Sequence, residues 1–225
     1  MMVAEIPRGF RLNPNRRLIR LIILLLMPFV CMLATPRRAA GATGPHGTVG
    51  LIADQNVVRP GRPFWVGLHF QMEEGWHIYW TNPGDSGEPP RVKWSLPSGF
   101  QAGPLEWPVP HRIEDHSLID YGYQNEVLLP VKITPPEKIV GGSDVRLNAL
   151  VNWLVCREIC VPGRADVTLT LPIRTDTPEP PSSVHFLFAK AQADLPRPPP
   201  KSWKASSKPT PRPPSSARPC SSWPW

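Results

Sequence analysis

Hydrophobic and polar residues alternate along seven short segments of this chain. The segments are Thr48–Ala53, Phe64–Gln71, His77–Thr81, Val92–Leu96, Val127–Ile133, Val145–Val155 and Asp166–Ile173. Successive side chains of a β-strand point to opposite faces, so this pattern predicts strands with one buried face each. Turn-forming residues lie between the segments, and Asn82–Gly87 is predicted to be a turn that ends a strand.

The spacing of these segments predicts an all-β fold. Seven or more short strands, without a long stretch of helical periodicity, favour an antiparallel β-sandwich. One short helix is predicted at His185–Asp194. The predicted core consists of Leu51, Trp65, Leu68, Phe70, Trp94, Leu128, Val131, Leu147, Leu150, Leu169 and Leu171.

Two cysteines with three residues between them, Cys156 and Cys160, follow the longest of these segments. Three residues is a common hairpin-loop length, and residues that flank such a loop face each other about 5 Å apart. That distance suits a disulfide, whose Cα atoms lie roughly 4.4–6.8 Å apart. A ring this short stabilises a fold by only about 2 kcal/mol. The sequence therefore favours a bridge that is present for its chemistry.

Charge divides the chain into three parts. Residues 1–42 contain seven Arg and one Glu, residues 43–195 contain 12 basic and 17 acidic residues, and residues 196–225 contain six basic residues and no acid. The net charge of +7 therefore belongs to the two ends. Binding to nucleic acid needs clustered Lys and Arg on a folded face, so the acidic middle part argues against that function.

Residues 1–42 are predicted to be a signal peptide. Arg16, Arg17 and Arg20 precede an apolar run over residues 21–34, and Ala40-Gly41-Ala42 has the small residues of a cleavage site. The run is shorter than the roughly 20 residues of a membrane-spanning helix, although an uncleaved membrane anchor remains the alternative. Export would place the cysteine pair in a compartment where disulfides persist.

The last 30 residues differ in composition from the rest. Residues 196–225 contain ten Pro, seven Ser and three Trp. Such a segment cannot bury enough apolar surface to fold alone, which predicts a disordered tail. Its end, including Cys220, is alternatively explained as out-of-frame translation of a GC-rich gene.

Three segments resemble the periplasmic N-terminal domain of DsbD-type protein-disulfide reductases, in the branch that includes the copper-sensitivity suppressor proteins. They are Gly75–Gly87, Tyr121–Tyr123 with the following strand Glu126–Ile133, and Trp153–Pro162. The resemblance covers about residues 45–195. It implies an immunoglobulin-like sandwich, a component of a protein-disulfide reductase, that passes electrons from a thioredoxin-like domain to periplasmic disulfide proteins. The chain shows no counterpart of the family's membrane-embedded or thioredoxin-like domain, so we expect electrons to arrive in trans.

The resemblance also implies roles for the two cysteines. Cys160 would meet the partner and Cys156 would resolve the mixed disulfide. The best-known members have more residues between their cysteines than the three found here. A thiolate is the reactive form, and Arg157 can favour it next to Cys156, although Glu158 offsets that charge.

The segment Pro110–Ser117 stands where the family has a cap loop over the cysteines. The residues expected to form the cap or line the cysteines are His111, Glu114, His116, Tyr121 and Tyr123. The first three can accept a proton near a thiol, since His titrates near neutral pH. A charged, solvated loop is the alternative. Trp76, Tyr79 and Trp80 are expected to pack in the core, with a place on the cysteine face as the alternative.

No metal or cofactor is predicted. Two thiolates would need two further ligands for tetrahedral zinc, and no His or Cys is close in sequence. Two functions compete with electron transfer. One is an exported binding module whose hairpin disulfide is structural. The other is copper handling, although Met72 would be the one Met left in the mature chain.

Overall fold

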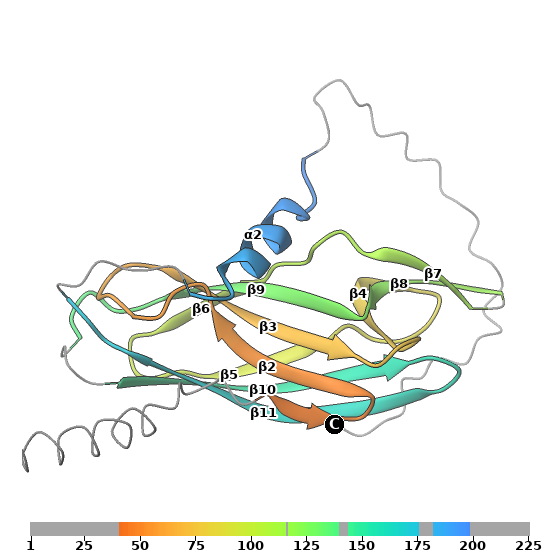
Figure 1. The fold of residues 1–225 in the computed structure, drawn as a ribbon, viewed down its shortest axis with the longest axis horizontal. Coiled ribbons are helices and arrows are strands. Elements are labelled where there is room, and N and C mark those ends of the chain that lie inside the picture. Colours follow the sequence, from red (N-terminus) through yellow and green to blue (C-terminus); the bar gives the residue numbers. More distant parts are fainter. Residues whose placement is uncertain (1–40, 116, 140–143, 176–181, 199–225) are drawn as a thin grey trace, which may run out of the picture. The chain divides into compact units, whose positions relative to one another are not determined.

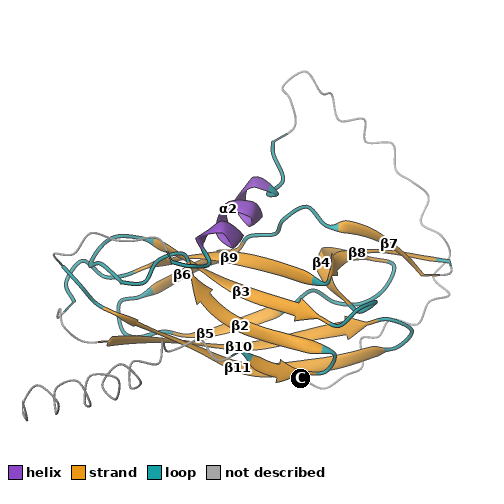
Figure 2. Cartoon of the chain, viewed as in Figure 1, coloured by secondary structure: helices purple, strands orange, loops and turns teal. Residues whose placement is uncertain are grey.

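The computed structural model describes residues 41–115, 117–139, 144–175 and 182–198. These residues form two antiparallel sheets and one short helix (Figure 2). The first sheet has the order β1 (Ala42–Gly44), β2 (Gly47–Ala53), β3 (Phe64–Met72), β9 (Glu126–Thr134) and β6 (Gln101–Leu105). The second has the order β11 (Cys160–Pro172), β10 (Asp144–Cys156), β4 (His77–Gly84), β8 (Leu118–Gln124) and β7 (His111–Asp115), with β5 (Arg91–Ser95) beside β10.

The main hydrophobic core draws on both sheets, which confirms the predicted antiparallel β-sandwich. Along β10 and β11 buried residues alternate with more exposed ones, as expected for strands with one face toward a core. Of the predicted core residues, this core contains Leu51, Leu68, Phe70, Val131, Leu147, Leu169 and Leu171. Trp94 packs against it from a partly buried position. Leu150 is half-buried and lies outside it.

Helix α2 (His185–Ala193) confirms the predicted helix, one residue shorter at its end. It lies over β9 in Figure 1 and buries Phe188 and Ala191 against Leu128. Leu128 therefore belongs to a separate cluster, because it points away from the core while Leu129 points inward. Trp65 packs against the same cluster.

Strands β1, β6, β7 and β8 lie outside the seven predicted segments. Strand β7 falls in the segment expected to be a loop, and its residues pair with β8 from His111–Gly122 to Asp115–Leu118. Its sequence, HRIED, has one apolar residue, so backbone pairing forms this strand rather than burial of an apolar face. In the described ranges no helix is long and apolar enough to cross a membrane. The predicted signal peptide, apart from Gly41 and Ala42, and most of the predicted tail lie outside those ranges.

Candidate functional site

The end of the β10–β11 hairpin contains the cysteine pair. Cys156 is the last residue of β10 and faces Cys160, the first residue of β11, with 4.2 Å between their Cα atoms. A disulfide joins them, and residues 157–159 form the loop between them. The disulfide-bridged hairpin that the sequence predicts is therefore confirmed.

The two cysteines differ in exposure. Cys156 is 3% exposed, pairs with His77 of β4, and forms a small cluster with Tyr79 and Leu154. Cys160 is exposed, as are the three loop residues before it at the tip of the hairpin. Thiol–disulfide exchange requires one sulfur to approach another directly, and Cys160 is the more exposed residue of the pair.

A line of polar side chains leads away from the exposed sulfur. The Tyr79 hydroxyl lies 3.6 Å from Cys160 Sγ and 3.3 Å from Ser86 Oγ. The Ser86 hydroxyl donates a hydrogen bond to Asp120 Oδ2 at 2.6 Å, and the Ser86 backbone N–H donates to Oδ1 at 2.8 Å. Tyr79 and Asp120 are 1% and 4% exposed. The sulfur is thus connected to a buried carboxylate through two hydroxyl groups.

The turn after β4 covers Tyr79. Gly87 has a φ of +71°, and a Cβ atom there would lie 2.1 Å from Tyr79 Cζ, so only glycine fits against this ring. Asp85 fixes the turn to β8, because its backbone N–H donates to Ile119 O and its carboxylate accepts from the Ile119 N–H. The segment predicted to be a turn that ends a strand therefore also covers Tyr79, which lies beside the cysteines.

The hairpin loop contacts a second aromatic residue. The Arg157 guanidinium lies 5.3 Å from the centre of the Trp76 ring, at cation–π distance. His46 stacks on Trp76 with 3.5 Å between ring centres, and its Nδ1 lies 3.0 Å from Glu73 Oε2 in a hydrogen bond. Trp76 belongs to the main core, which confirms its predicted packing, and Trp80 packs against that core. Tyr79 instead lies beside the cysteines, the arrangement given as its alternative.

The structure describes four of the five residues expected to form the cap or line the cysteines. Glu114 is exposed and forms an ion pair with Arg112, and His116 lies outside the described residues. Tyr121 and Tyr123 alternate along β8 with Asp120, so they point away from the cysteine face. Tyr123 is in the main core and donates a hydrogen bond to Pro108 O at 2.7 Å, and burial raises its pKa.

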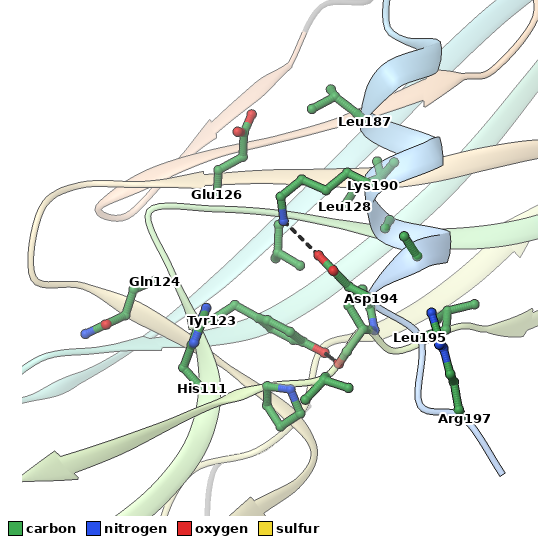
Figure 3. Close-up of a pocket in the computed structure, with 16 residues that line it drawn as sticks. His111, Tyr123, Gln124, Glu126, Leu128, Leu187, Lys190, Asp194, Leu195 and Arg197 are labelled. Carbon is green, nitrogen blue, oxygen red and sulfur yellow. Dashed lines mark hydrogen bonds and ion pairs between the residues drawn. The ribbon is translucent and has the colours of Figure 1, made fainter.

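His111 lies in a groove of about 570 Å³ between α2 and the end of β8. Figure 3 shows His111 and Tyr123 on one side of this groove and the Lys190–Asp194 ion pair of α2 on the other. Gln124 also lines it, and Gln124 pairs with His77, the neighbour of Cys156. The groove is therefore separated from the cysteine pair by the width of β4. Within the described residues no group of three metal-ligating side chains occurs.

The sequence of the sandwich matches one known family. The family is described as thiol:disulfide interchange protein DsbD, N-terminal, and its model matches residues 49–172, more than half of the chain. The chain belongs to this family. The matched range contains the cysteine pair, Tyr79, Ser86 and Asp120. The domain is thus an immunoglobulin-like thiol–disulfide exchange domain of the DsbD N-terminal type, as the resemblance implied.

The solved structures that are similar to the chain include two N-terminal domains. The N-terminal periplasmic domain of ScsB from Proteus mirabilis shares 24% sequence identity with a TM-score of 0.50. The match covers 70% of this chain and 59% of that one. The reduced N-terminal domain of DsbD from Neisseria meningitidis shares 13% identity with a TM-score of 0.32, over 68% of this chain and 97% of that one. Among curated proteins, none matches the sequence.

Sequence reasoning missed two residues of this site, Ser86 and Asp120. Ser86 stands in a turn, where polar residues are common. Asp120 gives a weak signal, since it is an acidic residue between Ile119 and Tyr121 that the structure buries. Buried Asp is rare unless it is paired, but burial of β8 was not predicted.

Proposed function

We propose that this domain carries electrons in the periplasm by thiol–disulfide exchange through Cys156 and Cys160. A thioredoxin-like protein reduces the disulfide, and the resulting dithiol reduces periplasmic proteins that contain disulfides. The observation that supports separate roles for the two cysteines is the difference in their exposure. Cys160 forms the mixed disulfide with the partner, and buried Cys156 resolves it.

Trapping tests this proposal. In the Cys156→Ala variant, Cys160 has no resolving partner and is expected to accumulate a mixed disulfide with an oxidised thioredoxin-fold protein. The matched control is Cys160→Ala, in which the remaining thiol of the pair is buried and is expected to give no adduct. Non-reducing electrophoresis and mass spectrometry of the adduct identify the cysteine. Equal yields from the two variants would contradict the proposed roles.

A redox titration separates this function from that of a purely structural bridge. Structural disulfides in secreted proteins usually have potentials below about −300 mV, whereas exchanging pairs lie between about −120 and −270 mV. We expect the Cys156–Cys160 pair to equilibrate in the second range while the sandwich stays folded. A bridge that opens only on unfolding would favour the binding-module alternative.

The proposed location depends on export. We expect the signal peptide to be cleaved near Ala42, which would leave most of β1 in the mature protein. N-terminal sequencing of the protein from a periplasmic fraction tests this. Recovery of the uncleaved chain in the membrane fraction would instead indicate an anchor.

A further inference from the structure

A hydrogen-bonded path connects the exposed sulfur with the interior of the protein. It runs from Cys160 through Tyr79 and Ser86 to Asp120, with donor–acceptor distances of 3.6, 3.3 and 2.6 Å. We propose that Tyr79, Ser86 and Asp120 form a proton relay that takes the proton from the Cys160 thiol and later returns it. This inference rests on the exchange function proposed above and adds residues to it.

The direction of the path follows from how many protons each group has. An ionised carboxylate can only accept hydrogen bonds, and both oxygens of Asp120 accept from Ser86. The Ser86 hydroxyl has one proton, which it donates to Asp120, so its oxygen accepts from Tyr79. The Tyr79 oxygen then accepts from the thiol of reduced Cys160. Every donor therefore points from the sulfur toward the carboxylate.

Burial suits the path to proton transfer. Tyr79 and Asp120 are almost fully buried, and Gly87 lies against the tyrosine ring. Hydrogen bonds are stronger in such a low-dielectric environment than in water. Cys160 is exposed at the other end, so the path links the reacting sulfur with an acceptor that is largely shielded from solvent. Tyr79 touches the reacting atom, whereas Ser86 and Asp120 act through it.

The reaction is balanced as follows. The Cys160 proton shifts to Tyr79, the Tyr79 proton to Ser86, and the Ser86 proton to Asp120, while the Cys160 thiolate attacks one sulfur of the partner's disulfide. A new S–S bond forms, and the second partner sulfur leaves with the bonding electron pair and takes a proton from water.

Cys156 completes the exchange. Its thiol loses a proton to water and attacks Cys160 Sγ, which breaks the mixed disulfide. The departing partner sulfur lies beside Tyr79 and receives the stored proton back from Asp120 along the same path. Two electrons and two protons pass from the domain to the partner, one disulfide forms and one is reduced.

Alkylation of Cys160 across a range of pH tests the relay without any partner. The full chain is reduced, desalted and treated with iodoacetamide, which reacts with thiolates. Cleavage after Arg157 and Arg164 by trypsin gives a peptide whose one cysteine is Cys160, separate from the peptide with Cys156. We expect Tyr79→Phe and Ser86→Ala to raise the midpoint of the Cys160 profile by about one pH unit, or about tenfold in rate at pH 7.

Conservative and matched variants separate the relay from packing. Ser86→Thr retains a hydroxyl and is expected to restore the profile of the unmodified chain. Ser95→Ala removes an exposed serine hydroxyl on β5 and is expected to leave the profile unchanged. If Ser86→Ala is folded by circular dichroism and its profile overlaps that of the unmodified chain, the relay is overturned.

The two proposals can fail separately. A pH profile that depends on Ser86 together with no trapped adduct would support the relay and contradict the partner function. An adduct together with a profile that does not depend on Ser86 or Tyr79 would overturn the relay alone.

Discussion

The outer faces of the two sheets are covered in different ways. Helix α2 covers the first sheet with apolar contacts, in which Phe188 and Ala191 pack on Leu128. The turn after β4 covers the second sheet with polar contacts, in which Ser86 joins Tyr79 to Asp120. Apolar cover stabilises a fold in proportion to its buried area, whereas buried polar groups cost stability unless each is hydrogen-bonded.

This difference indicates a division of roles. We expect changes on the helix-covered face to leave the sulfur chemistry unaffected, because its apolar cluster and that of Cys156 are separate among the described residues. On the other face the turn residues Ser86 and Gly87 contact Tyr79, which in turn contacts Cys160, so stability and reactivity are expected to change together. The predictions below test this division.

The largest expected effect on stability is that of Phe188→Ala. Removal of a fully buried aromatic ring is expected to lower the free energy of unfolding by about 3–5 kcal/mol. Urea unfolding measures this loss, and Cys160 alkylation under folding conditions is expected to be unchanged. Phe186→Ala is the matched control on the same helix, because Phe186 is 65% exposed and its loss is expected to cost under about 0.5 kcal/mol. A changed alkylation rate in folded Phe188→Ala would contradict the division.

Gly87→Ala is expected to change both properties. Its positive φ and its contact with the Tyr79 ring predict a loss of about 2 kcal/mol. The displaced ring is also expected to uncover Cys156, so that the reduced protein is alkylated faster at that residue. The control is Gly50→Ala, where the nearest atom to an added Cβ, Gly41 Cα, lies at 3.4 Å. If Cys156 of reduced Gly87→Ala is alkylated no faster than in the unmodified chain, the turn does not shield Cys156.

Tyr123→Phe is expected to have a smaller, pH-dependent effect. Loss of the hydrogen bond to Pro108 O is expected to lower the free energy of unfolding by about 1 kcal/mol at neutral pH. Because burial raises the pKa of Tyr123 in the folded protein, its contribution is fully present below about pH 10 and is lost as the pH rises further. The variant should therefore lose less stability than the unmodified chain between pH 10 and 11. Urea unfolding measures this, and an equal fall in the free energy of unfolding of the two proteins over this pH range would contradict the prediction.

Arg157→Ala is expected to have the smallest effect. Loss of the cation–π contact with Trp76 at the protein surface is expected to lower the free energy of unfolding by about 0.5–1 kcal/mol. Arg157→Lys retains a cation and is expected to lose less than the alanine variant. Chemical unfolding of the two variants compares them, and equal losses would show that the charge above the ring contributes nothing.

The sequence predicts the sandwich and the cysteine hairpin because both depend on local patterns. Alternation of apolar residues defines most of the strands, and three residues between Cys156 and Cys160 define the loop. The path from Cys160 to Asp120 joins residues 81 and 34 positions apart, which no local pattern reports. Tyr123 lies in the core and not beside the cysteines because neighbouring residues of β8 point to opposite faces of the sheet. The sequence did not predict β8 as a strand, so it could not assign Tyr123 to either face.

The position of β11 at the edge of its sheet limits how another protein can approach. An open edge invites a further strand, and natural proteins discourage this with proline and charged residues. Pro162, Arg164 and Asp166 are exposed along β11 directly after Cys160. We expect them to disfavour pairing along the strand, which would direct a partner to the tip of the hairpin, where it would meet the domain end-on.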